Sequence, residues 1–110
     1  MTREPRKKDL DLARRAAAAI RELYPDAEIF LYGSRARGKP VRFSDMDLLV
    51  LTSEKLPWIE EEKIMDAVSP LEWETDVIIC PLVEERGRRY SGKYQAMPLA
   101  KVIKEEGIRL

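Results

Sequence analysis

Residues 33–38 read Gly-Ser-Arg-Ala-Arg-Gly, and residues 44–51 read Ser-Asp-Met-Asp-Leu-Leu-Val-Leu. The first segment is an arginine-rich turn bounded by glycines, and the second places Asp45 and Asp47 at the start of an apolar run. Side chains two residues apart in a strand project from the same face, so these two carboxylates are expected to lie side by side. Because like charges repel at this spacing and arginine binds phosphate well, the pattern predicts a site for a divalent metal ion beside phosphate.

The chain has 110 residues, with 20 Lys and Arg against 20 Asp and Glu, and therefore no formal net charge. This length predicts a single domain over residues 1–110. The charge balance argues against stable binding of duplex nucleic acid, which usually needs a basic excess. One cysteine and no histidine indicate a protein of the reducing cytoplasm without histidine-based zinc or general-base chemistry. No long apolar segment follows the basic N-terminus, so neither a signal peptide nor a membrane-spanning helix is expected.

Apolar spacing, helix breakers and turn residues predict an α+β domain with a small mixed β-sheet and helices mainly on one face. The face that carries the two aspartates is expected to be open to ligand. The order of elements is α-β-α-β-α-β-α, in which the second α position is a turn able to open a short helix. The expected ranges are helix 6–24, strand 28–32, turn 33–38, strand 47–51, helix 57–69, strand 74–81, loop 84–96 and helix 99–106, capped by Gly107.

A third carboxylate, Asp76, is predicted to lie early in the third strand. If that strand neighbours the second, Asp76 completes a three-carboxylate site with Asp45 and Asp47. Magnesium prefers such oxygen ligands, and two ions about 3.5–4 Å apart would clamp the attacking and leaving oxygens of an in-line displacement. Asp76 would then hold the metal ion on the nucleophile side, while Cys80, in an apolar run, is expected to be a small buried hydrophobe.

The turn has the residue types that a phosphate site needs. Gly33 lets the chain turn tightly and lets phosphate approach the backbone, and Ser34 can donate a hydroxyl hydrogen bond. Arg35 and Arg37 offer planar guanidinium donors suited to phosphate oxygens. Each feature also has a plain structural alternative, such as an ordinary turn, a turn-capping aspartate, a surface carboxylate or solvated arginines. Their joint occurrence in this order favours the functional interpretation.

The pattern Gly-Ser, ten residues, Asp-x-Asp resembles the nucleotidyltransferase superfamily related to DNA polymerase beta, and more narrowly the minimal nucleotidyltransferases of bacteria and archaea. The likeness extends through Thr75-Asp76-Val77-Ile78 to the tail over 103–110. It implies the polymerase beta-like fold and a magnesium-dependent enzyme. Such an enzyme moves a nucleoside monophosphate from a nucleoside triphosphate, typically ATP, to an acceptor and releases pyrophosphate.

The resemblance also implies roles for the motif residues. Asp45, Asp47 and Asp76 match the catalytic metal-binding triad, which holds two Mg²⁺ ions. Gly33 and Ser34 match the triphosphate-binding turn, and the two arginines of the turn, Arg35 and Arg37, fall within the nucleotide-binding motif, Arg35 at a position close to the phosphates. No core position departs from the pattern.

Minimal nucleotidyltransferases often work with a separate small helical HEPN protein. In several pairs the HEPN protein is a toxin, and the nucleotidyltransferase acts as antitoxin by adenylylating it. The resemblance therefore implies a HEPN partner as acceptor. Two alternatives stay open: the same chemistry on a small molecule, with a homo-oligomer supplying the missing half, or an antitoxin that acts only by binding.

Two further regions have both a structural and a functional interpretation. The segment 84–96 is either a lid or partner surface, or a solvated connection. Trp58 and Trp73 flank the helix over 57–69 as core residues or as interface anchors.

Overall fold

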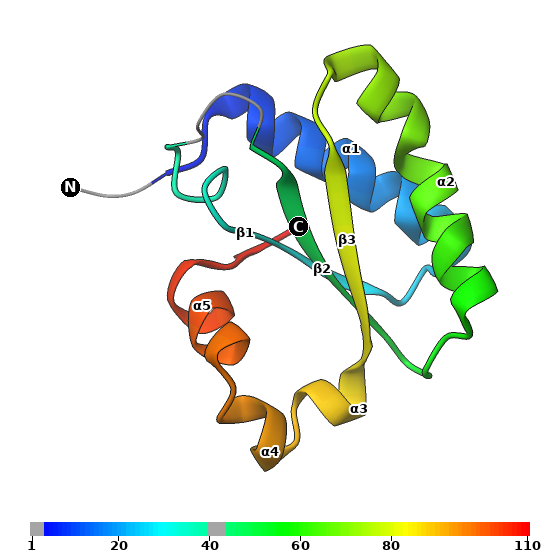
Figure 1. The fold of residues 1–110 in the computed structure, drawn as a ribbon, viewed down its shortest axis with the longest axis vertical. Helices are drawn as coiled ribbons and strands as arrows, with labels where there is room; N and C mark the ends of the chain where they lie inside the picture. The colour runs from blue at the N-terminus through cyan, green and yellow to red at the C-terminus, as the bar shows by residue number, and fades with distance from the viewer. Residues whose placement is uncertain (1–3, 40–43) are drawn as a thin grey trace.

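The computed structural model describes residues 4–39 and 44–110. Within these residues the chain forms helices α1 (Lys7–Leu23), α2 (Trp58–Thr75), α3 (Arg86–Arg89), α4 (Gly92–Gln95) and α5 (Pro98–Glu106) (Figure 1). The strands are β1 (Glu28–Tyr32), β2 (Met46–Thr52), β3 (Ile79–Glu85) and β4 (Ile108–Arg109). They form a four-stranded sheet in the order β3-β2-β1-β4. Because β1 runs antiparallel to β2 and β4 while β2 and β3 are parallel, the predicted mixed sheet is confirmed.

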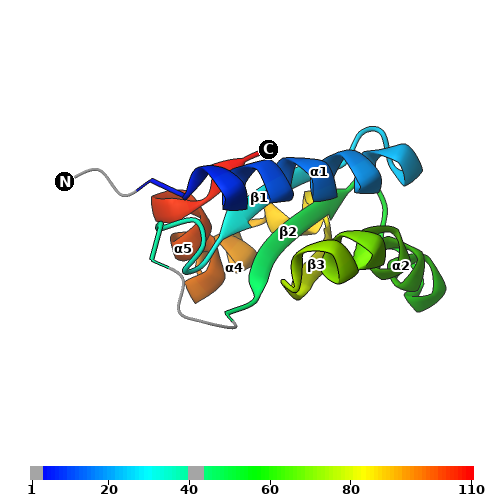
Figure 2. The same ribbon diagram turned by 90° about the horizontal axis from the view of Figure 1, so that it is seen from above.

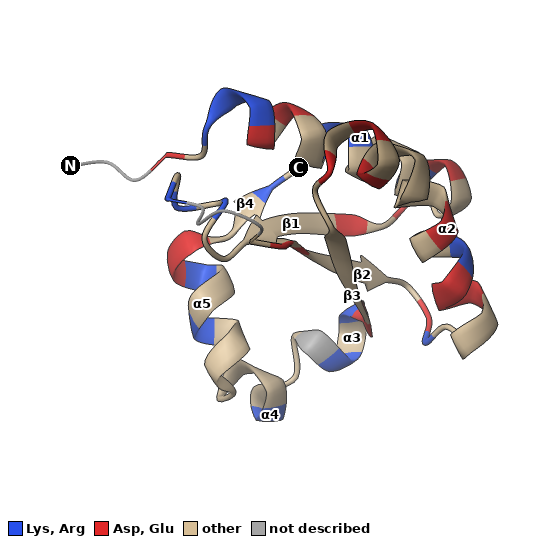
Figure 3. Cartoon of the chain, turned by 45° about the horizontal axis from the view of Figure 1, so that its top comes forward, with Lys and Arg blue, Asp and Glu red and all other residues tan. Residues whose placement is uncertain are grey.

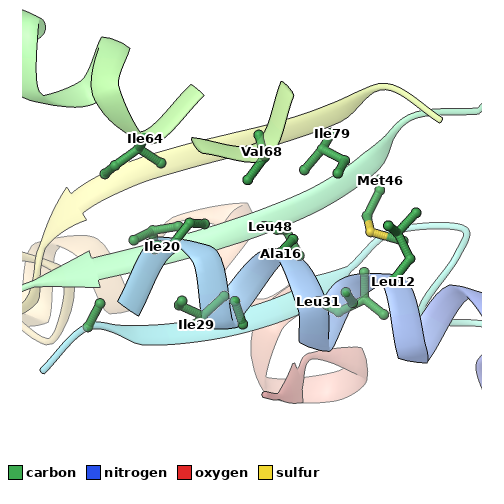
Figure 4. Packing of buried hydrophobic residues seen from close by; sticks show 14 of the residues in the cluster. Leu12, Ala16, Ile20, Ile29, Leu31, Met46, Leu48, Ile64, Val68 and Ile79 are labelled. Atoms are coloured by element: carbon green, nitrogen blue, oxygen red, sulfur yellow. The ribbon is translucent and has the colours of Figure 1, made fainter. Parts of the chain in front are cut away.

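The main core lies between the sheet and the two long helices, α1 and α2 (Figures 2 and 4). Apolar residues recur along α1 at helical spacing, so one stripe of this helix is buried against the sheet. From β2, every second side chain enters this core, beginning with Met46 and continuing with Leu48 and Val50. Each such side chain contributes about 1.5–3 kcal/mol when it is fully buried. The predictions of helix 6–24 and of the strands over 28–32 and 47–51 are therefore confirmed to within a residue or so.

The opposite face of the sheet is only partly open. Leu49 and Leu51 of β2 are each 1% exposed, and with Phe30 they line a cavity of about 290 Å³ against Ala100 and Ile103 of α5. The expectation that helices lie mainly on one face holds for the two long helices. The second face was expected to be open to ligand; α5 covers its middle, while Asp45 is exposed and Asp47 is half-buried. The segment expected to be a loop contains the end of β3 and the short helices α3 and α4.

The region around Pro70 departs most from the expected structure. The helix α2 continues through Pro70 to Thr75 instead of ending near residue 69. Packing favours this continuation, because Ile64 and Val68 before the proline are buried and Leu71 after it packs against the same core. The third strand therefore begins at Ile79 rather than near residue 74.

Strand β3 forms an edge of the sheet. Its first residue, Ile79, donates its backbone N–H to Glu72 Oε2 of α2 at 2.9 Å, while the Ile78 carbonyl accepts from Met46 N of β2. Two residues further along β3 lies Pro81, which has no N–H to donate.

The chain returns to the sheet after α5 through Gly107. A side chain at Gly107 would place its Cβ 2.4 Å from the Ile103 carbonyl oxygen, so the close approach of the two backbones requires glycine there. The backbone of Gly107 is extended, with φ −65°, and it leads into β4, where Ile108 lies opposite Leu31. This short strand was not expected from the sequence. The pairing of β4 with β1 places Glu106, at the end of α5, beside the end of β1. None of the helices within the described ranges is long and apolar enough to cross a membrane.

Candidate active site

The turn after β1 is tight and does not continue as a helix. Gly33 has φ +83°, a left-handed conformation that glycine adopts readily. Its carbonyl accepts from the N–H groups of Ala36 (3.1 Å) and Arg37 (3.2 Å), and the Ser34 carbonyl accepts from Lys39 N. The hydrogen bonds within the turn therefore use the later N–H groups. The N–H groups of Ser34 and Arg35, at the beginning of the turn, take no part in these hydrogen bonds. The first N–H groups of a helix are likewise not used within the helix.

Asp45 and Asp47 lie directly beside this turn. In β2, Asp47 is in register with Tyr32 of β1 and with Cys80 of β3. A Cβ added to Gly33 would lie only 2.6 Å from Asp47 Oδ2, so the turn and this carboxylate are in contact. Asp45 precedes β2, is exposed, and accepts a 3.6 Å hydrogen bond from Cys80 Sγ. The structure thus brings Gly33, Asp45 and Asp47 together.

The two aspartates give the site a negative potential. The pKa of Asp47 is raised by burial and then by the charge of Asp45. Burial, followed by the charge of Asp45, raises the pKa of the Cys80 thiol to about 11, so Cys80 is neutral at physiological pH and is a half-buried neighbour of the site rather than a core residue. Burial and the charge of Asp47 also raise the pKa of Tyr32. A carboxylate whose ionisation is opposed by a neighbouring carboxylate, as Asp47 is by Asp45, fits a hard divalent cation such as Mg²⁺, which would relieve that repulsion.

Asp76 does not lie where the sequence predicted. It is an exposed residue at the C-cap of α2 with left-handed backbone angles (φ 57°, ψ 21°), and its N–H bonds the Glu72 carbonyl. The strand position beside Asp47 is held by Cys80 instead. Within residues 4–39 and 44–110, no group of three carboxylate, thiol or imidazole side chains is placed to hold a metal ion. The predicted position of Asp76 early in the third strand is therefore wrong, because α2 extends further than expected.

Arg35 faces the interior rather than a ligand. It is 8% exposed; its Nη1 donates to Asp9 Oδ1 of α1 at 2.7 Å, and its Nε and Nη2 donate to the Ser44 carbonyl at 3.2 and 2.8 Å. The guanidinium thus joins α1, the turn and the segment before β2. These contacts use three of its five N–H donors, so its expected role as a phosphate donor stays a prediction. Asp9 was not singled out from the sequence, although it falls on the apolar stripe of α1 one turn before Leu12 and Ala13, where a charged residue needs a partner.

Arg37 lies on the outer side of the turn and pairs with Glu106. Its Nη1 donates to Glu106 Oε1 at 2.9 Å and to Oε2 at 3.1 Å, and the same Oε1 accepts from Gly33 N at 3.3 Å. Figure 3 shows the acidic end of α5 beside the basic turn. Glu106 was not predicted as a site residue either, because nothing near it in the sequence indicates that β4 brings it to the turn.

Comparison with known proteins identifies the family. The sequence profile of the nucleotidyltransferase domain family matches residues 13–109. The chain belongs to the nucleotidyltransferase domain family. Over 61 residues it is 31% identical to the "Probable protein adenylyltransferase MntA" of Haemophilus influenzae, in a match that covers 54% of each protein. The chain thus matches about half the length of this curated relative. The family predicted from the turn and the Asp-x-Asp motif is confirmed.

Solved structures show the same fold for this nucleotidyltransferase domain. A crystal structure of the toxin–antitoxin MntA-HpeT, in mutant form, matches with a TM-score of 0.62 at 18% identity, covering 88% of this chain and 70% of that one. A toxin–antitoxin crystal structure with AMP-PNP matches with a TM-score of 0.62 at 20% identity and the same coverage. The tri-AMPylated Shewanella oneidensis HEPN toxin in complex with MNT antitoxin matches with a TM-score of 0.58 at 17% identity, covering 92% and 70%. The predicted fold class is therefore confirmed.

Proposed function

We propose that this chain is a nucleotidyltransferase that transfers AMP from ATP to an acceptor hydroxyl and releases pyrophosphate. The observation that carries this proposal is the direct contact between the Gly33 turn and Asp47, with Asp45 alongside. A phosphate-binding turn and a pair of metal-binding carboxylates must lie this close, since the metal ion and the triphosphate share oxygen atoms in such reactions.

The carboxylates would hold the metal. Asp45 and Asp47 provide oxygen ligands of the kind Mg²⁺ prefers, and exposed Asp45 leaves room for water and phosphate oxygens. When bound, Mg²⁺ would neutralise phosphate charge and favour ionisation of the acceptor hydroxyl. Two ions remain part of this proposal, although the described residues supply only these two neighbouring carboxylates.

The turn would hold the triphosphate. Gly33 has no side chain to keep phosphate from the backbone, Ser34 can donate its hydroxyl, and Arg37 is the arginine on the accessible side of the turn. In the transfer, the acceptor hydroxyl loses its proton to solvent as its oxygen bonds to the α-phosphorus, the bond from that phosphorus to the bridging oxygen breaks, and pyrophosphate leaves with the electron pair. Donors fixed in the turn stabilise the charge that this step places on the phosphates.

The acceptor would come from a partner chain, most simply a HEPN toxin. Three features support this: the relative named as a probable protein adenylyltransferase, the fold shared with antitoxins in HEPN complexes, and exposed aromatic side chains on α2. Trp58 and Trp73 are 72% and 87% exposed, so they are not the core residues that one interpretation allowed, and they suit an interface with a partner or a second copy.

The test is transfer of labelled AMP from ATP to a HEPN protein. Asp47→Asn should lower transfer at least about 100-fold. Removal of a residue that hydrogen-bonds a metal ligand costs up to about 100-fold, and removal of a ligand itself should cost no less. Asp76→Asn tests the third ligand that the resemblance implies: because Asp76 is exposed at the end of α2, we expect transfer to change by no more than about twofold. A loss as large as that of Asp47→Asn would instead support the predicted third ligand.

Protection of cells separates catalysis from binding. If Asp47→Asn abolishes labelling yet still protects cells from the partner, the antitoxin acts by binding and the enzymatic proposal is wrong for that partner. Pyrophosphate release with small hydroxyl compounds, and none with the HEPN protein, would favour a small-molecule acceptor.

A further inference from the structure

A carboxylate of the chain itself lies where the phosphate would bind. Glu106 accepts hydrogen bonds from Gly33 N at 3.3 Å and from Arg37 Nη1 at 2.9 and 3.1 Å. Both donors belong to the turn proposed to hold triphosphate. The Glu106 side chain is 22% exposed and that of Arg37 is 36% exposed, so the contact lies at the surface of the turn, within reach of a ligand.

A carboxylate oxygen and a phosphate oxygen accept the same hydrogen bonds from a backbone N–H and a guanidinium. The N–H of Gly33 cannot serve both at once, and a second anion beside Glu106 would be repelled by it. We infer that Glu106 competes with the phosphates of the ligand for Gly33 and Arg37, and thereby sets the affinity of the turn for triphosphate. This inference rests on the proposed function and deepens it.

The geometry allows the side chain to leave the turn without rearranging the fold. Glu106 is the last residue of α5, and its backbone is held by Gly107 and by the pairing of Ile108 with Leu31. A cleft of about 350 Å³ adjoins the contact, lined by Ala36, Arg37, Glu105, Glu106, Gly107 and Ile108. Release of the carboxylate therefore requires only a rotation of the Glu106 side chain, and the vacated donors become available to phosphate.

The neighbouring residue provides a matched control. Glu105 carries the same charge and is the next-to-last residue of α5, but its carboxylate pairs with Lys101 at 4.0 Å and its side chain is 64% exposed. Glu105→Gln therefore removes one negative charge at almost the same place without changing the contact with the turn. Glu106→Asp is the complementary variant, since it keeps the charge but shortens the side chain by one methylene group.

The experiment is calorimetric titration of the full chain with ATP and, separately, with inorganic tripolyphosphate, both with Mg²⁺ and at one ionic strength. Glu106→Gln should bind both ligands about three- to tenfold more tightly than the unsubstituted chain, the scale of a partly exposed charged contact. Glu105→Gln should change the dissociation constant by less than about twofold. Glu106→Asp should also bind more tightly, because its carboxylate no longer reaches both donors. Thermal unfolding of each variant checks that the fold is kept.

The outcomes separate this inference from the proposal on which it rests. If Glu106→Gln binds tripolyphosphate no more tightly than Glu105→Gln does, or more weakly than the unsubstituted chain, Glu106 does not compete and the inference is wrong, whether or not AMP transfer occurs. If Glu106→Gln binds tripolyphosphate more tightly but no variant binds ATP or transfers AMP, the competition is real and the nucleotidyl-transfer proposal fails.

Discussion

Two arginines in the same turn, two residues apart, occupy opposite environments. Arg35 is 8% exposed and joins Asp9 to the Ser44 carbonyl. Arg37 has a side chain that is 36% exposed, and it contacts Glu106. The inner arginine shapes the turn, and the outer one is available to a ligand. An arginine-rich turn can thus contain one arginine that is buried against the fold and one that is open to solvent, and the element packed behind the turn decides which is which.

The largest effect is expected from the inner arginine. Arg35→Ala leaves Asp9, which is 2% exposed, as an uncompensated buried charge, and removal of one partner of a buried pair costs about 3–5 kcal/mol. Arg37→Ala should lower the free energy of unfolding by less than about 1 kcal/mol, since partly exposed ion pairs contribute little. Urea unfolding followed by circular dichroism measures both. Equal losses of unfolding free energy in the two variants would mean that Arg35 and Arg37 contribute equally to stability.

A smaller effect, on binding rather than on stability, is expected from the outer arginine. Arg37→Ala should weaken Mg–ATP binding about tenfold, the value of one hydrogen bond to a charged group. The substitution Glu106→Gln should then have a smaller effect in the Arg37→Ala background than in the unsubstituted chain, because one of the two contested donors is gone. Titration calorimetry of the single and double variants tests this coupling. Additive effects would indicate that Arg37 and Glu106 act on the ligand separately.

The smallest effect is a pH dependence of stability, caused by Asp47 beside the turn. The folded chain raises the pKa of Asp47 above its ordinary value of 3.8, so between the two values the folded state binds more protons than the unfolded state. Stability therefore falls as the pH rises through that window, and ionised Asp47 destabilises the fold at neutral pH. We expect Asp47→Asn to unfold at a higher temperature than the unsubstituted chain at neutral pH, in EDTA, with the gain disappearing below the ordinary pKa.

Thermal unfolding from about pH 3 to pH 7 checks that dependence. A loss of stability in Asp47→Asn at neutral pH would mean that the Asp47 carboxylate stabilises the fold, as Arg35 does.

The sequence was sufficient for features set by local patterns. Helical spacing located α1, and the apolar run after Asp47 located β2, because buried stripes impose a period on the sequence. The turn and its two aspartates could be predicted together because the motif is short and one hairpin pairing joins its halves.

Features set by distant contacts could not be predicted in the same way. The helix was expected to end near residue 69, but packing on both sides of Pro70 continues α2 and moves Asp76 out of the strand. Asp9 lies 26 residues from Arg35, and Glu106 lies 69 residues from Arg37, so only the folded topology reveals either pair. The sequence thus identified the residues of the turn but could not assign Arg35 and Arg37 to their different roles.

The edge of the sheet at β3 has a consequence for how this protein associates with others. An exposed strand normally offers a row of N–H donors to which another strand can be added. On the outer side of β3, Glu72 already accepts from the N–H of Ile79, and Pro81 has no N–H to offer. Strand addition at this edge would start with one occupied donor and one missing donor. The β3 edge therefore resists chain-to-chain sheet extension, and at this edge a partner or second copy would be recognised through side chains rather than through a continued β-ladder.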